Sequence, residues 1–421
     1  MARKTTSQSI PNNTFTKLTF DAEDYDDGSW HDPTNNSRLT VPPGVSVVKV
    51  FAGIQWGPSS SGDRVLRLTR NGSDLAGPGL PGQSWQAPNG PNRMRQCFQS
   101  PPLEVEPGDY FELEVWQSSG GSLDAEADPE TFFGIMAVNT TRRALLRLDS
   151  NFAISATLSY IDWDAADYDT DGFWNAGAPS RLTIPAGVSK VRLFACIRAD
   201  TTAITHLFCN IDKNGSSFLG GGALEPDAMA SPNRTRVCLA SAVVAVTEGD
   251  YFEVQTRANT PANIQASENT YFGLEVVEQS EMSSALVRMS ANQTIPASTQ
   301  TVVDWGSEVH DDAGYWDAGS PSRLTVPAGV DVAILTAYAA FADNNTGDRW
   351  IEIRKNGSDT VAGMLLPESP VSDNDRAYAQ SPPLKVVAGD YFEVLVWQGS
   401  GGDLDLLDAN TTFFSIEGLP A

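Results

Sequence analysis

The sequence has few of the residues on which many enzymes and secreted proteins depend. Its 421 residues include four cysteines and three histidines, and no two cysteines form a CxxC pair. Four cysteines in a chain of this length are too few for a disulfide-stapled scaffold. We therefore expect synthesis in a reducing cytoplasm and cysteines that behave as small buried hydrophobes. A Cys196–Cys238 or Cys196–Cys209 bridge is the less favoured alternative.

Long apolar runs and basic residues are also scarce. The longest nearly apolar stretch, 332–341, is well short of the ~18–20 residues that span a bilayer. Residues 1–10 have no apolar core, so we expect no secretory signal there. Lys and Arg number 28 against 53 Asp and Glu, which gives a formal net charge of −25. Because this charge repels phosphate and anionic lipid, we expect neither a nucleic-acid partner nor membrane insertion.

The sequence contains three tandem copies of one repeat. Four anchors recur in the same order: the Ser-Arg-Leu-Thr strand at 37, 180 and 322, the Asn-Gly pair at 71, 214 and 356, the Gly-Asp-Tyr-Phe strand at 108, 249 and 389, and the Thr-aromatic-Phe strand at 131, 270 and 412. The period of about 142 residues is far longer than the repeats of solenoids, so each copy is a whole domain. The predicted domains are 1–138, 139–279 and 280–421.

Within each copy the local signals are those of strands and turns. In 190–197 apolar residues alternate with Lys190 and Arg192, which predicts a half-buried strand with the two basic residues on its outer face. The Asn-Gly pairs are typical of tight hairpins. No stretch combines helical periodicity with caps. We therefore predict an all-β chain of three tandem antiparallel β-sandwiches.

Aromatic residues on the outer face of the Gly-Asp strand favour contact between the copies. A loop that folds over this face within one copy is the alternative. The predicted interface residues are Tyr110, Trp116, Tyr251, Tyr391 and Trp397 on these strands and Phe132, Phe272 and Phe413 on the closing strands.

The order of these elements resembles the C1q/TNF-like jelly-roll family. The first copy supplies the segments that carry the resemblance, namely Phe20-Asp21, Tyr25-Asp26, Thr40-Val41-Pro42, Asn71-Gly72, Gly108-Asp109 and Phe133-Gly134-Ile135. The resemblance implies threefold packing, so three copies in one chain imply a covalently joined pseudo-trimer. Without an export signal or a stalk, such tandem domains look most like structural proteins of tailed bacteriophages.

Motifs for catalysis are missing, and one acidic segment is a candidate cation site. We predict no catalytic residues and no cofactor, because no nucleophile, P-loop or metalloprotease motif occurs. Asp167, Asp169 and Asp171 match the first half of a calcium loop, but the twelfth position is Ala178 where a bidentate Glu is required. A solvated acidic turn is the favoured interpretation, with Ca2+ as the alternative.

The leading hypothesis is a non-enzymatic surface protein of a virion, made in the host cytoplasm. Its expected role is capsid decoration, cement or head spike of a tailed bacteriophage or phage-like particle, with capsid or other virion proteins as partners. One alternative is the tip of a tail fibre that binds a host receptor or surface glycan, and another is a polysaccharide-degrading enzyme. The polar start Met1–Ser9 lacks the apolar first strand of the later copies, so we expect it to form a docking arm or to fray.

Overall fold

The computed structural model describes residues 1–74, 79–86, 94–127, 129–138, 141–199, 207–224, 236–267, 269–277, 282–366, 376–408 and 412–420. Within these ranges the chain is built from strands, and one short 3-10 helix, η1 (Pro33–Asn35), is the helical element. None of the described residues forms a helix long and apolar enough to cross a membrane. The predicted all-β class is confirmed.

The strands repeat in the same order three times. The first copy contains β1 (Ala2–Arg3), β2 (Gln8–Ile10), β3 (Thr16–Lys17), β4 (Ala22–Glu23), β5 (Arg38–Thr40), β6 (Val47–Gln55), β7 (Asp63–Arg70), β8 (Gly82–Gln86), β9 (Arg95–Gln99), β10 (Leu103–Glu104), β11 (Tyr110–Gln117), β12 (Leu123–Ala125) and β13 (Phe132–Ala137). The second contains β14 (Arg143–Arg147), β15 (Phe152–Ile154), β16 (Ser159–Tyr160), β17 (Ala165–Asp169), β18 (Arg181–Thr183), β19 (Lys190–Arg198), β20 (Leu207–Lys213), β21 (Ser216–Leu224), β22 (Arg236–Ala240), β23 (Val244–Ala245), β24 (Tyr251–Ala258), β25 (Ala262–Ile264) and β26 (Tyr271–Val276). The third contains β27 (Ser283–Arg288), β28 (Gln293–Ile295), β29 (Thr301–Val302), β30 (Ser307–Asp311), β31 (Arg323–Thr325), β32 (Val332–Ala340), β33 (Arg349–Lys355), β34 (Asp359–Leu366), β35 (Arg376–Gln380), β36 (Leu384–Lys385), β37 (Tyr391–Gln398), β38 (Leu404–Leu406) and β39 (Phe413–Leu419).

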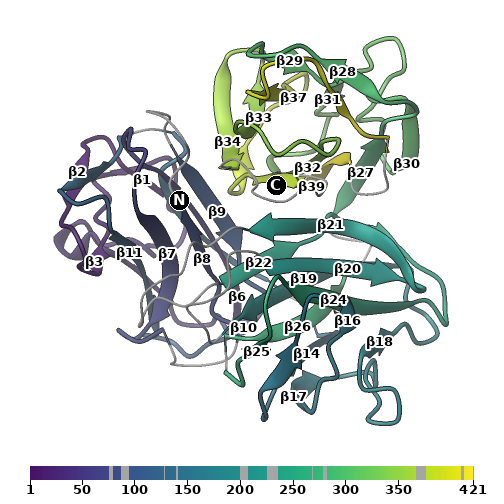
Figure 1. Cartoon of the computed structure of the whole chain (residues 1–421). Helices are drawn as coiled ribbons and strands as arrows, with labels where there is room; N and C mark the ends of the chain where they lie inside the picture. The colour runs from purple at the N-terminus through teal and green to yellow at the C-terminus, as the bar shows by residue number, and fades with distance from the viewer. Residues whose placement is uncertain are drawn as a thin grey trace.

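Each copy is an antiparallel β-sandwich of the jelly-roll type. In the second copy a six-stranded sheet has the order β17-β14-β26-β19-β22 with β23 also on β19, and a five-stranded sheet has the order β16-β24-β20-β21 with β18 also on β24. The other two copies repeat this topology, and each sheet takes its described strands from a single one of the ranges 1–138, 139–279 and 280–421. Figure 1 shows the three sandwiches arranged around a common centre.

The turn chemistry explains how each sandwich closes on itself. Asn71 and Gly72 have φ of 52° and 82°, as a type I′ hairpin requires. The Asn71 amide then donates to the Asp109 carboxylate at 2.7 Å, and the second copy repeats this contact between Asn214 and Asp250 at 2.8 Å. Burial opposes ionisation of Asp250, but hydrogen bonds from Lys213 and Asn214 outweigh it and lower the pKa of Asp250 to about 2. These carboxylates tie the hairpin to the start of β11 in the first copy and of β24 in the second.

The start of the chain is a strand, which contradicts the expected free arm. Ala2 and Arg3 form β1, which pairs with Phe133 and Phe132 of β13 on one side and with β4 on the other. Ala2 is fully buried, and Lys4 is also buried and donates to the Thr19 carbonyl at 2.7 Å. Although these residues are more polar than their counterparts in the later copies, backbone pairing and one buried alanine are enough to hold them in the sheet.

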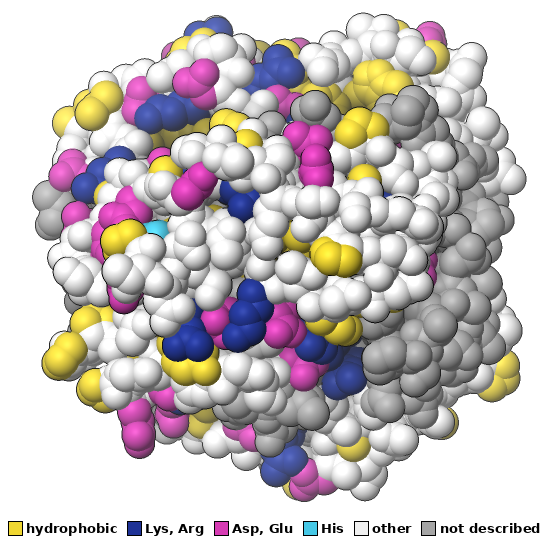
Figure 2. Space-filling view, turned by 90° about the vertical axis from the view of Figure 1, so that its left-hand side faces the viewer, with side chains coloured by type: hydrophobic (Ala, Val, Ile, Leu, Met, Phe, Trp, Pro, Cys, Tyr) yellow, Lys and Arg dark blue, Asp and Glu magenta, His cyan; other side chains and the backbone are white. Residues whose placement is uncertain are grey.

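The surface carries charges of both signs. Figure 2 shows acidic and basic side chains intermixed on one face, without a separate patch of either. Several of these groups pair with each other, for example Arg67 with Glu114 at 2.6 Å and Lys213 with Asp250 at 2.8 Å.

Candidate functional site: the junctions between the copies

The three sandwiches close into a ring through equivalent strands. Strand β8 of the first copy contacts β22 of the second, β21 of the second contacts β35 of the third, and β34 of the third contacts β9 of the first. Strands β8, β21 and β34 occupy the same position in the repeat, and so do β9, β22 and β35. The chain is therefore a single-chain pseudo-trimer, as predicted, in which each copy meets the next in the same way.

A matched set of arginines reaches across each junction to the preceding copy. The Arg236 guanidinium lies 2.9 Å from the Asp74 carboxylate of the first copy, and the Arg376 guanidinium lies 5.4 Å from the Phe208 ring of the second. Arg95 completes the ring, since its guanidinium lies 3.6 Å from the Glu352 carboxylate of the third copy. At every junction, therefore, the arginine comes from one copy and its contact from the copy before it in the ring.

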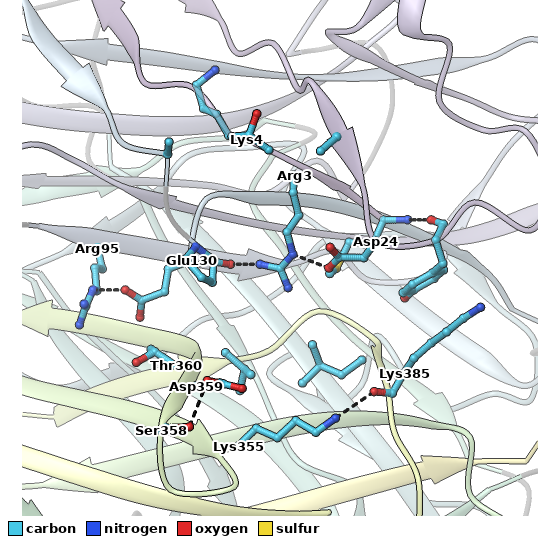
Figure 3. A pocket seen from close by; sticks show the side chains of 18 residues that line it. Arg3, Lys4, Asp24, Arg95, Glu130, Lys355, Ser358, Asp359, Thr360 and Lys385 are labelled. Carbon is cyan, nitrogen blue, oxygen red and sulfur yellow. Dashed lines mark hydrogen bonds and ion pairs between the residues drawn. The ribbon is translucent and has the colours of Figure 1, made fainter.

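The junction between the first and third copies contains a groove of about 800 Å3. Figure 3 shows Arg3, Asp24 and Glu130 on the side of the first copy and Lys355 and Lys385 on the side of the third. Two of the three acidic groups here have cationic partners: Asp24 pairs with Arg3 and Glu130 with Arg95. The third, Asp359, accepts a hydrogen bond from the Ser358 hydroxyl at 3.1 Å. The groove is thus a charged seam in which most of the carboxylates are paired with arginine.

Charged side chains are buried deep in two of the junctions. Lys49 of the first copy pairs with Glu275 of the second, and Arg192 pairs with both Glu275 and Glu417 of the third. All four are buried, and the Arg192 Nε also donates to Glu417 at 3.0 Å. Burial alone would raise the pKa of the Glu275 carboxyl, but Lys49 and Arg192 hold that pKa below its usual range. The set contains two basic and two acidic side chains, and burial, followed by the nearby Arg192, lowers the pKa of the Lys49 ammonium to about 7.

The third junction uses apolar residues at the same two positions. The match of Lys49 and Arg192 in the third copy is Ile334, and the match of Glu275 and Glu417 in the first copy is Met136. Ile334 and Met136 belong to one hydrophobic cluster with Phe51 and Phe132. An ion pair at two junctions is therefore replaced by an apolar contact at the third.

Next to these charged positions, each copy has one pair of facing residues on two adjacent strands, and the pair differs from copy to copy. Two facing positions on β19 and β22 hold Cys196 and Cys238, which form a disulfide with their Cα atoms 4.0 Å apart. The third copy holds Tyr338 and Tyr378 there, with ring centroids 4.7 Å apart. The first copy holds Gly53 and Cys97, and a Cβ on Gly53 would lie 2.5 Å from the Phe132 ring.

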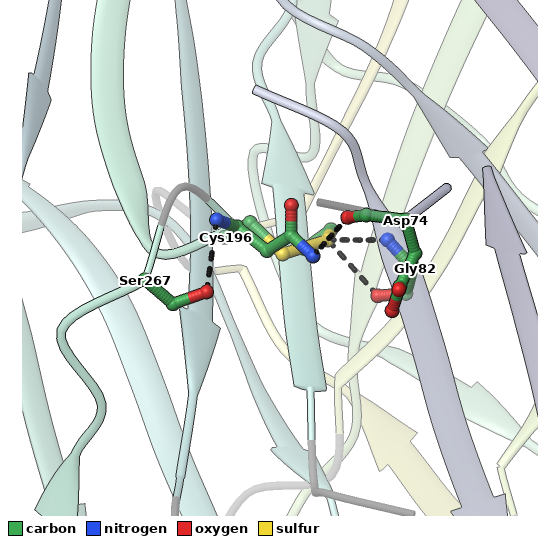
Figure 4. The surroundings of a disulfide bond; sticks show 6 residues. Asp74, Gly82, Cys196 and Ser267 are labelled. Carbon is green, nitrogen blue, oxygen red and sulfur yellow. Dashed lines mark hydrogen bonds between the residues drawn. A yellow bond between two sulfur atoms is a disulfide. The ribbon is translucent and has the colours of Figure 1, made fainter. Parts of the chain in front are cut away.

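The Cys196–Cys238 disulfide contradicts the expectation of free thiols for these two cysteines. It lies on the junction with the first copy, where the Cys238 sulfur is 3.3 Å from the Gly82 amide nitrogen (Figure 4). Adjacent strands place the two side chains face to face, which spacing along the sequence does not reveal. Cys97 and Cys209 are free and buried, as expected, and burial raises the pKa of the Cys97 thiol to about 12.

Reducing this disulfide should lower the stability of the chain. Its cysteines are 42 residues apart, and a loop of that size corresponds to about 4 kcal/mol of unfolding free energy. Urea unfolding of the oxidised protein with and without dithiothreitol measures the difference. In a Cys196→Ala/Cys238→Ala control the reductant should have no effect, and an unchanged midpoint for the unsubstituted protein would contradict the prediction.

The structure places the predicted interface residues in different environments. Phe132 contacts Ile334 of the third copy. Phe413 packs on Tyr338, whose hydroxyl donates to the Ala240 carbonyl of the second copy at 3.3 Å. Phe272 instead lies in the core of its own copy, with its ring 6.0 Å from that of Trp163. Of the closing-strand residues, Phe132 contacts another copy, Phe413 packs on a tyrosine that does, and Phe272 lies in the core of its own copy.

The aromatic face of the Gly-Asp strands is covered within each copy, which corrects the predicted interface. The guanidinium groups of Arg38, Arg181 and Arg323 lie 4.0, 4.0 and 4.1 Å from the rings of Tyr110, Tyr251 and Tyr391. Trp116 packs on Val65 and on Phe15, a residue of the loop before β3. Trp397 pairs in register with Trp350 of the same copy. In the described part of the chain, these contacts come from loops and neighbouring strands of the same copy.

The structure does not bring the three candidate calcium ligands together. Asp167 pairs with Arg147 at 2.8 Å and Asp171 with Arg142 at 3.2 Å. The Asp169 carboxylate accepts hydrogen bonds from the backbone amides of Phe173 and Trp174. No group of three potential ligands converges anywhere in the described ranges.

Sequence reasoning missed the buried charges of the junctions. Arg192 and Lys190 were expected on a solvent face, but both are buried against other copies. The available signal was a charged residue inside an otherwise apolar strand, as with Lys49 among valines and Glu417 in the last strand. Such a residue needs a partner when it is buried.

The sequence and the structure were compared with known proteins, and only solved structures gave matches. No protein-family model matches the sequence, and no curated protein does. A crystal structure of murine APRIL is 17% identical and covers 33% of this chain and 100% of its own, with a TM-score of 0.27. Eiger TNF from S. frugiperda is 14% identical, covering 33% and 93%, with a TM-score of 0.25. A triple jelly-roll turret protein of an archaeal virus is 10% identical and covers 97% and 91%, with a TM-score of 0.17. The first two are TNF-like jelly rolls, and no argument about this chain rests on scores this low.

Proposed function

We propose that this chain is a non-enzymatic surface protein of a virus particle, added as a decoration protein or head spike to the shell of a tailed bacteriophage. The observation that supports the proposal is the closed ring of three sandwiches. Four buried charged groups, Lys49, Arg192, Glu275 and Glu417, hold the copies to one another. The chemistry of these side chains thus serves assembly.

A ring of this kind fits a threefold site on a larger assembly. Three similar domains around one axis present three similar surfaces, and the local threefold positions of an icosahedral shell have the same symmetry. Covalent fusion removes the cost of gathering three subunits before docking. The net charge of −25 suits an exterior in contact with water and cations, and it disfavours a place against packaged nucleic acid.

Antibody labelling of purified particles tests the proposal. Electron microscopy should show antibody against this chain distributed over the heads, and particles from a deletion strain should show none. Label confined to the tail tips would replace the proposal with the receptor- or glycan-binding alternative. Absence of the chain from purified particles would overturn both.

A further inference from the structure

The third copy has a histidine where the other two copies have a tyrosine that crosses a junction. Tyr25, Tyr168 and His310 occupy the same position of the repeat. The Tyr168 hydroxyl donates to the Pro102 carbonyl of the first copy at 2.9 Å, and the Tyr25 hydroxyl donates to the Pro383 carbonyl of the third. Of these three side chains, the imidazole alone titrates near neutral pH.

His310 lies in the junction between the second and third copies. Its Nε2 is 3.1 Å from the Oγ of Ser284, a buried residue of β27. The single hydroxyl proton of Ser284 is donated to the Asp312 carboxylate at 2.9 Å, so Ser284 Oγ accepts from the His310 Nε2–H. Lys190 of the second copy completes the group, because its ammonium pairs with Asp312 and lies 3.5 Å from Ser284 Oγ.

The other ring nitrogen of His310 has no acceptor for a proton. Nδ1 is buried and has no hydrogen-bond partner among the residues that the structure describes. In the neutral imidazole this nitrogen carries only a lone pair, whereas in the imidazolium it is an N–H donor. Since a buried donor without an acceptor is unfavourable, protonation of His310 weakens the arrangement of the junction.

Charged groups approach His310 from both copies. They are Lys190 on β19 of the second copy, Asp311 at the end of β30 and Asp312 directly after it. Glu417 of β39 is paired in register with Ser284, and its carboxylate is held by Arg192 of the second copy. The cation of the second copy therefore opposes a positive charge on His310, and the two aspartates favour it.

The balance of these effects disfavours the imidazolium. Burial, followed by the charge of Lys190, lowers the pKa of His310 below its ordinary value of 6.5, although Asp312 and Asp311 act in the opposite direction. The folded junction consequently binds fewer protons than the opened one. Its stability is complete above pH 6.5 and is lost as the pH falls from there through the lower pKa of the folded state.

We propose that His310 makes the junction between the second and third copies pH-sensitive, so that its protonation in mildly acidic solution loosens this junction and leaves the other two closed. Tyr25 and Tyr168 keep their hydroxyl protons in the same range, because burial raises the pKa of both above its usual value. The ring opens in acid on one side, and the third copy stays in contact with the first. This inference does not depend on the proposed function.

Hydrogen exchange of the full chain at pH 7.5 and 5.5, read by mass spectrometry and corrected for intrinsic rates, tests the proposal. We expect exchange in β19 and β27 to accelerate at pH 5.5 by up to about tenfold, because an exposed histidine with a pKa of about 6.5 is then mostly protonated. Strands β6 and β14, which occupy the matched positions at the junction of the first and second copies, should show no such acceleration.

Two glutamine variants assign the effect to one histidine. In His310→Gln the side-chain amide still donates to Ser284 but takes up no proton, so the acceleration should disappear. His31→Gln is the matched control: it removes a buried histidine of the first copy that is bonded to Glu23, and it should retain the acceleration. Equal acceleration in His310→Gln and the unsubstituted chain, or equal acceleration at β6 and β14, would overturn the proposal.

Nuclear magnetic resonance of the chain with labelled histidine measures the protonation directly, and the His310 signal is identified by its absence from His310→Gln. We expect the imidazole of the unsubstituted chain to titrate below pH 6.5. Lys190→Met should raise this pKa, because the variant removes the neighbouring cation. An imidazole that titrates at or above pH 6.5 in the unsubstituted chain would contradict the proposal whatever the exchange data show.

Discussion

Replacing Arg192 by alanine is expected to lower the free energy of unfolding by about 3–5 kcal/mol. The guanidinium lies between Glu275 of its own copy and Glu417 of the third copy, and all three side chains are buried. Without it, Glu417 is left as a buried charge that loses its cationic partner, and this is far costlier than the loss of a surface pair. Urea unfolding at pH 7, with circular dichroism to verify the strand content, measures the loss.

A control for this prediction is supplied by the chain itself. The variant Lys49→Ile, Arg192→Ile, Glu275→Met, Glu417→Met gives all three junctions the apolar pair that Ile334 and Met136 form at the third. Removing buried charges together and filling their volume with apolar atoms is expected to be neutral or stabilising by about 1–4 kcal/mol. If Arg192→Ala costs less than about 1 kcal/mol, as for an exposed pair, the carboxylates are not desolvated as described.

Phe272→Ala should destabilise the chain by about 3–5 kcal/mol, the usual cost of removing a large aromatic side chain from a core. Phe272 is fully buried, and its ring stacks on Trp163 within the second copy. The matched control is Tyr251→Ala, which removes an aromatic ring stacked under Arg181 on a partly exposed face and should cost only about 0.5–1 kcal/mol. Thermal unfolding of both variants makes the comparison, and similar losses would contradict the assignment of Phe272 to the core.

The fold could be predicted because its determinants are local. The Asn71-Gly72 pair predicts a tight hairpin, and the structure has the positive φ at both residues that this turn requires. The alternation along 190–197 predicts a strand, and the three repeats of the same anchors predict three copies of one domain. Together they predict three sandwiches, whereas closure of the ring was implied by the resemblance to the C1q/TNF-like family and not by these local signals.

The junctions could not be predicted to the same extent, because alternation identifies two faces of a strand without saying what covers the outer one. Lys190 and Arg192 lie on the face opposite the core, as expected, and that face is buried by other parts of the chain. Tyr110 was predicted to contact another copy, but Arg38 of the same copy covers its ring. Which outer face meets another domain depends on packing between bodies, and a single strand does not encode it.

The unequal junctions have a consequence for the history of the chain. If the third copy were separated and assembled with itself, each interface would place Ile334 against Glu417, and the centre would bury three carboxylates without a cation from either position. The second copy alone retains both halves of the ion pair, Arg192 and Glu275. After such divergence the three copies are no longer interchangeable, because their order along the chain decides whether each buried carboxylate at the centre faces a basic side chain.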